Sequence, residues 1–207
     1  MDKDTLSRRT WSLYVLQDLF EIKSTQSSID KKNLDKTPGQ IPYITRSDKN
    51  NGIDMFIGVQ PSYANDEGNV ITIGLDTQTV FYQPKAFYTG QNIQVLRHPN
   101  LNRYVAEFLV VPLKRMMANL NWGGNGATLT RLKRSKILLP SLADGTPDWQ
   151  FMEEYMRQIE QRQLKPIINI LCKRLINNEL TGGVIAFILV GQPLTLPRYS
   201  QYLRASA

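Results

Sequence analysis

The sequence IQVLRHPNLNRYVAEFLVVPLKRMMANL, residues 93–120, contains the change of pattern that decides the fold. Its first part, Ile93–Leu96, is a short run of β-type residues and predicts a strand. From Leu101 to Leu120 the apolar residues recur at steps of three and four, which predicts a helix lying on a core. Asn100 or Asn102 can cap the start of this helix. The chain therefore changes here from strands to helices.

The residues before this point have the pattern of a sheet. Short β-type runs bounded by Gly, Pro, Asn or Asp predict strands at residues 41–45, 55–59, 70–73 and 79–82. The sequence NDEGN (65–69) between two of these runs predicts a hairpin connection. Residues 11–22 have a mixed pattern, and the polar stretch 23–40 predicts a loop.

The residues after the first helix predict one more strand and a second helical region. The glycine-rich WGGNGATLT (122–130) leads into RLKRSKILLP (131–140), in which four cations precede a short apolar strand. A helical pattern then begins after the glycine at 145. We expect Thr146 to cap this helix and Pro147 to occupy its first position.

Two prolines lie inside the helical patterns. We expect Pro112 to kink or divide the first helix and Pro166 to break or restart the second. Together the patterns predict an α+β fold, a twisted and mainly antiparallel β-rich domain with flanking helices and a C-terminal helical segment. The expected divisions are an N-terminal extension (1–10), a central domain (11–145), a helical segment (146–180) and a tail that packs on the domain (181–207).

Composition is that of a globular protein. The chain has 207 residues, of which 42% are hydrophobic and 21% are charged, enough for one core. Its single cysteine, Cys172, cannot form an internal disulfide, and its first residues lack a signal sequence. The stretch Leu180–Pro197 is interrupted by glycines and a proline, so it predicts a buried strand rather than a membrane span. These features favour a cytoplasmic protein without membrane contact.

Positive charge is concentrated in residues 84–140. This segment contains nine Lys and Arg and one Asp or Glu, so its net charge is +8 (nine minus one), against +7 for the whole chain. Such an excess is typical of proteins that bind polyanions, because each cation placed on a phosphate releases condensed counterions. A solvated basic face is the alternative explanation.

Motifs for catalysis and for cofactor binding are largely absent. The single histidine, His98, excludes most metal sites and makes Ser-His-Asp chemistry a weak candidate. GGNGATL (123–129) lacks the Gly-Lys-Ser/Thr ending of a P-loop. Glu21-Ile22-Lys23 has the acid-x-lysine form of metal-dependent nucleases. The candidates for a partnering acid are Asp2, Asp4 and Asp18. We expect no catalysis, no cofactor and no metal.

Nucleic-acid recognition is the chemistry that remains. Lysine is a flexible point charge suited to phosphates, whereas arginine and asparagine make paired hydrogen bonds to guanine and adenine edges. The predicted phosphate ligands are Lys114, Arg115, Lys133 and Lys136. The predicted base readers, in or beside loops, are Arg46, Asn51, Asn121 and Arg131. Further candidates are Ser47, Lys49, Asn50, Lys85, Arg103, Trp122, Asn125 and Arg134. A tight Asn-Gly turn is the alternative role of Asn51, and core packing is that of Trp122.

Six segments follow one another along the chain: WSLYVLQDLFEIK (11–23), GQIPYITRSDKNNG (39–52), EGNVITIG (67–74), FYQPKAFYTGQNIQVL (81–96), NRYVAEFL (102–109) and GGNGATLTRLKRSKILLP (123–140). In this order they resemble the target recognition domains of restriction-modification specificity subunits. The ending DGTPDWQFMEEY (144–155) is more similar to the domains of type IIB or IIG enzymes, or of half-subunits, than to type I subunits. The residues that match family motifs are expected to be scaffold: Gly39, Pro42, Gly52, Gly68, Pro140, Asp148 and Trp149.

This resemblance implies that residues 11–145 form a domain that reads a few base pairs of double-stranded DNA. It also implies a methyltransferase or restriction-methylation subunit as partner, contacted through the helical segment 146–180. The chain has room for one recognition domain, which leaves open a second copy, a short DNA site, or a place in a larger enzyme. Two other interpretations are a nucleic-acid binder without base specificity and an adaptor or inhibitor that occupies a restriction enzyme.

Overall fold

The computed structural model describes residues 4–120 and 128–176. The glycine-rich residues 121–127 and the strand predicted within 180–197 lie outside this range. The chain divides into two units, residues 1–159 and 160–207, which are described separately. The described part of the first unit contains helices and three sheets, nearly all of whose strand pairs are antiparallel. The predicted α+β class is confirmed.

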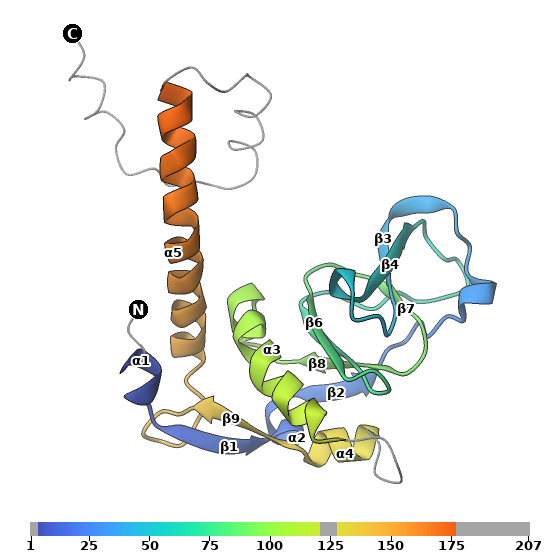
Figure 1. Cartoon of the computed structure of the whole chain (residues 1–207). Coiled ribbons are helices and arrows are strands. Elements are labelled where there is room, and N and C mark those ends of the chain that lie inside the picture. Colours follow the sequence, from blue (N-terminus) through green and yellow to red (C-terminus); the bar gives the residue numbers. More distant parts are fainter. Residues whose placement is uncertain (1–3, 121–127, 177–207) are drawn as a thin grey trace. The chain divides into compact units, whose positions relative to one another are not determined.

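The largest sheet is antiparallel and has the strand order β2-β8-β5-β6 (Figure 1). Its strands are β2 (Glu21–Ser24), β5 (Val70–Gly74), β6 (Thr79–Gln83) and β8 (Ile93–Arg97). Strand β5 is buried along its whole length, because it pairs on both sides and its apolar residues join the main core. The strands predicted at 70–73, 79–82 and 93–96 are confirmed.

A second sheet has the order β4-β3-β7. It consists of β3 (Pro38–Ile44), β4 (Ile53–Ile57) and β7 (Tyr88–Thr89), and it confirms the strands predicted at 41–45 and 55–59. Strands β3 and β4 are antiparallel, whereas β3 and β7 are parallel. A separate core cluster supports this sheet, made of Ile29, Leu34, Tyr43, Ile57 and Tyr88. Two short 3₁₀ helices flank it, η1 (Lys31–Asn33) and η2 (Asn50–Gly52).

The hairpin predicted at residues 65–69 is wrong. Strands β4 and β5, which flank this segment, belong to different sheets. Asp66 is buried and accepts hydrogen bonds from the backbone of Gln26 at 2.8 Å and from the hydroxyl of Ser27 at 2.9 Å. A buried carboxylate requires such partners, so the segment is held to distant residues instead of closing a turn. The tight hairpin lies at residues 75–78, between β5 and β6.

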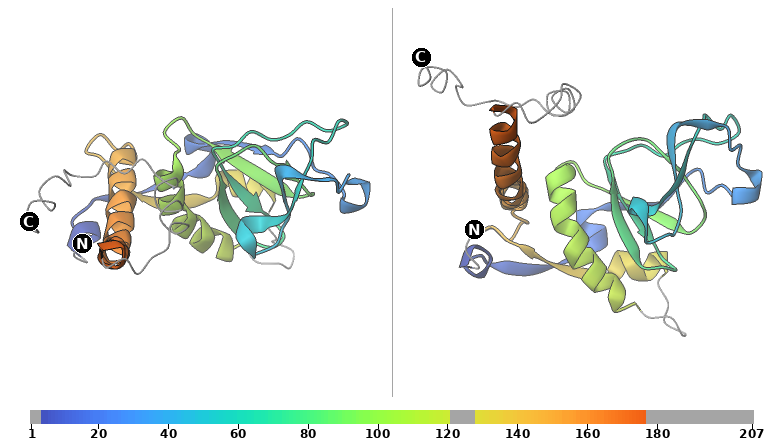
Figure 2. Two further views of the ribbon diagram at one scale, coloured as in Figure 1. Left: turned by 90° about the horizontal axis from the view of Figure 1, so that it is seen from above. Right: turned by 45° about the horizontal axis from the view of Figure 1, so that its top comes forward.

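Two strands that lie far apart in the sequence of the first unit form a two-stranded ribbon. β1 (Trp11–Val15) pairs antiparallel with β9 (Lys136–Pro140), so that Trp11 faces Pro140 and Val15 faces Lys136. Helix α1 (Asp4–Ser7) precedes β1, and helix α2 (Leu16–Leu19) follows it directly. The views of Figures 1 and 2 place this ribbon at one end of the unit and the β4-β3-β7 sheet at the other. The strand predicted within 131–140 is confirmed.

Helix α3 (Arg103–Ala118) packs on β6 and β9 through its apolar stripe. Asn102 caps it, as expected, by accepting hydrogen bonds from the backbone of Tyr104 at 2.9 Å and Val105 at 3.1 Å. Pro112 does not divide the helix, and that part of the prediction is wrong. Leu109 and Leu113, on both sides of the proline, are fully buried. Packing therefore stabilises the continuous helix against the lost backbone hydrogen bond.

Helix α5 (Trp149–Ile176) runs from the first unit into the second. Asp148, rather than Thr146, caps its start, because the Asp148 carboxylate accepts a hydrogen bond from the backbone of Phe151 at 2.9 Å. Pro147 accordingly lies before the helix. Pro166 does not break or restart the helix. The predictions for Thr146, Pro147 and Pro166 are therefore wrong. No helix in the described part of the chain combines the length and apolar character that a membrane span requires.

Candidate nucleic-acid interface

The loop between β3 and β4 is held in a tight turn. It carries the predicted DNA-contact residues Arg46, Ser47, Lys49, Asn50 and Asn51. The φ angles of Asn50, Asn51 and Gly52 are 50°, 57° and 78°, in the left-handed region that asparagine and glycine tolerate best. The backbone N–H of Gly52 donates to Lys49 at 2.8 Å, and its carbonyl accepts from Thr45 at 2.8 Å. The tight turn inferred from the Asn-Gly sequence is confirmed.

Asn51 also attaches this loop to strand β6. Its Nδ2 donates to the carbonyl of Tyr82 at 2.9 Å, and Nε2 of Gln83 donates to the carbonyl of Asn51 at 3.0 Å. One donor of the Asn51 amide is therefore used inside the protein, although the residue is exposed. Asn51 thus has a structural function beside its predicted contact with a base.

Arg46 extends from the same loop to a different turn. Its Nη1 forms an ion pair with Oδ2 of Asp76 in the β5–β6 turn. Nδ2 of Asn92, in the segment before β8, donates to that oxygen at 3.1 Å. The side chain of Arg46 is 43% exposed and that of Asp76 is 26% exposed. The guanidinium is therefore held from one side and accessible to solvent from another.

The last part of α3 brings two more predicted residues to the same hairpin. Lys114 and Arg115 are exposed. Nζ of Lys114 lies 5.3 Å from the centre of the Phe81 ring on β6, within the range of a cation–π interaction. Nε2 of Gln78, in the β5–β6 turn, donates to the carbonyl of Leu120 at 2.9 Å and fixes the end of this helix.

We refer to Arg46, Asn51, Phe81, Tyr82 and Lys114 as the β6 surface. A pocket of about 370 Å³ lies on this surface and is lined by Asn51, by the two aromatic residues and by an ion pair of α3. In that ion pair Nε of Arg103 lies 2.9 Å from Oε1 of Glu107. Asn51 and Arg103 therefore share one pocket, and Lys114 lies beside Phe81. Arg46 is bound to the β5–β6 turn through Asp76 and lines a different pocket, with Thr45 and Gly90.

A second group of cations lies on α4 (Leu129–Arg134) and at the start of β9. Leu132 is fully buried, Arg131 and Lys133 are half-buried, and Arg134 and Lys136 are exposed. The Thr128 hydroxyl caps the helix by accepting from the backbone of Arg131 at 3.2 Å. Cations in the last turn of a helix also interact favourably with its dipole. These residues therefore have a structural explanation as well as the predicted one.

The remaining predicted residues are not part of the β6 surface. Lys85 is exposed in the segment that follows β6. Arg103 lies at the N-terminal end of α3, away from Lys114. Asn121, Trp122 and Asn125 lie outside the described residues.

Four participants were not predicted from the sequence: Asp76, Phe81, Tyr82 and Asn92. An Asp in a turn between two strands is a signal for a side chain that bonds locally, and this signal could have indicated Asp76. Phe81 was read only as a strand residue. Asn92 has a φ of 61°, which explains an asparagine at this turn, but its bond to Asp76 required the fold.

The family-motif residues Asp148 and Trp149 fix the start of α5. Oδ2 of Asp148 lies 3.2 Å from Nη1 of Arg9. The ring of Trp149 stacks on His98 with 4.2 Å between centroids, and Phe20 meets both rings edge-on. Burial lowers the pKa of His98. These contacts are those of scaffold residues, as the sequence indicated.

Residues 8–169 match the family model described as the type I restriction modification DNA specificity domain. The chain belongs to this family. The matched range contains the whole β6 surface and the α4 cations. The resemblance inferred from the six ordered sequence segments is therefore confirmed.

The specificity domain also has a curated relative, the "Type II restriction enzyme BgcI specificity subunit S.BcgI" of Heyndrickxia coagulans. The two are 33% identical over 166 residues, which cover 78% of this chain and 47% of the relative. The chain thus spans about half the length of this relative. The name of the relative places it in a type II system, the class that the ending at 144–155 resembles.

Solved S subunits are similar to the specificity domain at low sequence identity. The type I S subunit from M. genitalium is 19% identical, with 82% of this chain and 41% of that chain covered and a TM-score of 0.46. The HsdS subunit from Thermoanaerobacter tengcongensis is 15% identical, with 73% and 38% covered and a TM-score of 0.49.

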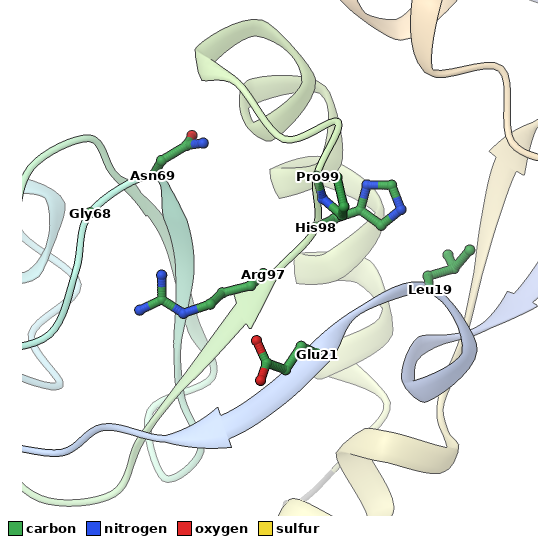
Figure 3. A pocket seen from close by; sticks show the side chains of 7 residues that line it. All are labelled: Leu19, Glu21, Gly68, Asn69, Arg97, His98 and Pro99. Atoms are coloured by element: carbon green, nitrogen blue, oxygen red, sulfur yellow. The ribbon is translucent and has the colours of Figure 1, made fainter.

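A further pocket of the specificity domain, about 390 Å³, lies beside β2 and β8 (Figure 3). It is lined by Glu21 and Arg97, which are opposite each other in the β2–β8 pair. A hydrogen bond from Lys23 lowers the pKa of Glu21. Among residues 4–120 and 128–176, no group of three or more His, Cys, Asp or Glu is placed to hold a metal ion. The acid-x-lysine motif is therefore not part of such a group in the described chain.

Proposed function

We propose that this chain is a single DNA-recognition module that directs a methyltransferase or restriction-methylation subunit to a short DNA sequence. The observation that carries the proposal is the match of residues 8–169 to a DNA specificity domain. The contacts of Arg46, Asn51 and Lys114 with the β5–β6 hairpin support it, because these residue types contact phosphates and base edges.

The cations and amides of the chain divide into two functional classes under this proposal. Lys114, Arg115, Lys133 and Lys136 contact phosphates and position the DNA. Arg46, Arg131 and Asn51 enter a groove and read bases, Asn51 with the amide atoms that Tyr82 leaves available. Asn121, outside the described residues, belongs to the readers by its sequence position alone.

Binding of the full chain to a randomised library of DNA duplexes tests this division. Replacing a phosphate ligand by alanine should weaken binding to every sequence alike and reduce the salt slope by about one. Replacing a reader should relax the preference at one base position, at a cost of about 1–3 kcal/mol on the preferred site. If all substitutions give one uniform loss, the division is wrong and the protein binds without base specificity.

Electrostatic binding has its own measurement. If six phosphates are neutralised, a plot of log affinity against log salt concentration should have a slope of about −5. An affinity that does not change between low and moderate salt would contradict the contribution of the cations. A chain that binds a methyltransferase subunit but no DNA would instead support an adaptor or inhibitor.

The proposed module performs no catalysis and needs no cofactor of its own. The purified chain should therefore show neither methyltransferase nor nuclease activity. The Glu21→Gln substitution is the control, because Glu21 is the only acid in the acid-x-lysine motif. Mg²⁺-dependent cleavage that this substitution abolishes would overturn the proposal and establish a nuclease.

We propose that the part of α5 in the second unit is the contact for a protein partner. Leu164 and Ile168 are 42% and 38% exposed, and with Leu171 they recur at steps of four and three on one face of the helix. The partner is the methyltransferase subunit or a second copy of the chain. A Leu164→Ser, Ile168→Ser double variant should lose the partner in a co-purification and sedimentation experiment.

Ile170 offers a matched control for that experiment. It is 54% exposed and lies away from the stripe, so Ile170→Ser should keep the partner. Loss of the partner by this control as well would show that the helix contributes without a defined face.

A further inference from the structure

The contacts of Arg46 differ from those expected of a residue that only neutralises phosphate. A phosphate ligand is most effective when its positive charge has no partner, because a neighbouring carboxylate repels the DNA backbone. Arg46 instead forms an ion pair with Asp76, and both side chains are only partly exposed. The pair therefore contributes little net charge, so its effect on binding must come from geometry.

Three separate segments converge to fix this geometry. Arg46 comes from the β3–β4 loop, Asp76 from the β5–β6 turn and Asn92 from the segment before β8. The backbone N–H of Leu75 donates to the Asn92 carbonyl at 3.3 Å, which joins the last two segments. Oδ2 of Asp76 thus forms the ion pair with Arg46 and also accepts the hydrogen bond from Asn92.

The aliphatic part of the Arg46 side chain is restricted as well. A Cβ added at Gly74 would lie 3.6 Å from Cγ of Arg46 and only 2.5 Å from the hydroxyl of Thr79. The aliphatic part of Arg46 therefore passes close to a position at which an added Cβ would require the Thr79 hydroxyl to move. The contacts of its aliphatic part and the ion pair of its Nη1 restrict the orientation of the planar guanidinium. The N–H groups of Nε and Nη2 are further hydrogen-bond donors.

We infer that Asp76 is a positioning residue that orients Arg46 to read a guanine. Arginine reads guanine by paired hydrogen bonds to O6 and N7, which requires the guanidinium plane to match the plane of the base. Asp76 provides that orientation before DNA binds, so less side-chain freedom is lost on binding. The inference rests on the proposed function, since it assumes that Arg46 contacts a base.

The test is a selection from a randomised duplex library with the full 207-residue chain and its variants. We expect the wild type to prefer guanine at one position and Arg46→Ala to lose that preference. Asp76→Asn should lose the same preference by about fivefold or more, with the other positions unchanged. The double variant should lose no more than either single variant. Asp76→Glu, which keeps the carboxylate, should recover part of the preference.

Asp54→Asn is the matched control. Asp54 forms an ion pair with Lys31 at 2.7 Å, and the exposed fractions of the two side chains, 29% and 56%, are close to those of Asp76 and Arg46. Its substitution removes the same charge and should leave every base preference unchanged. Thermal melting of each variant separates loss of contact from loss of fold, and Asp76→Ser, which also removes the carboxylate, replaces Asp76→Asn if the latter unfolds.

The outcomes separate the inference from the proposed function. A wild-type chain without any base preference would contradict the proposed function. A guanine preference lost in Arg46→Ala but retained in Asp76→Asn would contradict the positioning by Asp76 alone. A loss of preference at all positions in Asp76→Asn or Asp76→Glu, with melting unchanged, would also overturn the inference, because a positioning residue for Arg46 affects one base pair.

Discussion

Asp148 is a buried carboxylate that links two distant parts of the first unit. It caps α5 through Phe151 and pairs with Arg9. Asp148→Ala should lower the free energy of unfolding by about 2 kcal/mol, because a cap and a charged hydrogen bond are lost together. Urea unfolding measures the effect. The control is Asp144→Ala, since Asp144 is exposed and bonds only to the nearby Thr146; an equal loss there would contradict the explanation.

His98 should make stability depend on pH. Its pKa is lowered by burial, so the unfolded chain binds the proton more tightly than the folded chain. The contribution of neutral His98 is therefore complete above its usual value of 6.5 and is lost as the pH falls from there through the lower folded pKa. NMR titration of this single histidine should give a pKa below 6.5.

Unfolding measurements at two pH values complete that prediction. The wild type should lose more stability between pH of about 7.5 and about 5.5 than His98→Gln, which has no titrating group at this position. An equal loss in both proteins would show that other groups cause the pH dependence.

Residue types in the candidate site could be predicted, but their partners could not. The Asn-Gly sequence indicated the turn at Asn51, because that turn is a local property of two residues. The contact of Arg46 with Asp76 joins residues 30 positions apart and depends on how the β5–β6 hairpin meets the β3–β4 loop. The spacing of residues in the sequence does not show that this loop and this hairpin meet in the fold.

Helix α3 offers a prediction about its internal proline. Pro112 cannot donate a hydrogen bond to the carbonyl of Phe108, four residues earlier, and yet the helix is continuous. Pro112→Ala restores this donor and should raise the free energy of unfolding by about 1 kcal/mol or more. The comparison is Val111→Ala, which is exposed in the same helix and should have a smaller effect. Destabilisation by Pro112→Ala would mean that the proline ring itself is needed for packing.

The existence of the main elements followed from periodicity, whereas their pairing did not. Six predicted strand runs are confirmed, since a strand with a buried face must alternate or be wholly apolar. The division between two sheets depends on the buried Asp66, which holds the segment at 65–69 to the backbone near Ser27. Strand β1 was not predicted because its sequence, WSLYV, does not alternate between polar and apolar residues; its central residue, the apolar Leu13, is exposed.

The core of the first unit does not depend on the later part of α5. The main hydrophobic cluster ends at Met152, and residues 161–170 are exposed. A chain that ends at Gln163 should therefore fold and melt cooperatively near the temperature of the full chain. It should also bind DNA and fail to bind its protein partner. Circular dichroism melting and co-purification measure these properties, and an unfolded product would show that the removed residues complete the core.

The β1–β9 ribbon has a consequence for how new specificities arise. Because Trp11 faces Pro140 and Val15 faces Lys136, the residue at which the chain leaves β1 is next to the residue at which it enters β9. The residues between Val15 and Lys136, which include the β6 surface, form one segment whose two ends lie next to each other. Genetic recombination within β1 and β9 can therefore exchange this whole segment and leave the β1–β9 strand pair intact. Under the proposed function, the residues proposed to contact DNA would be exchanged together.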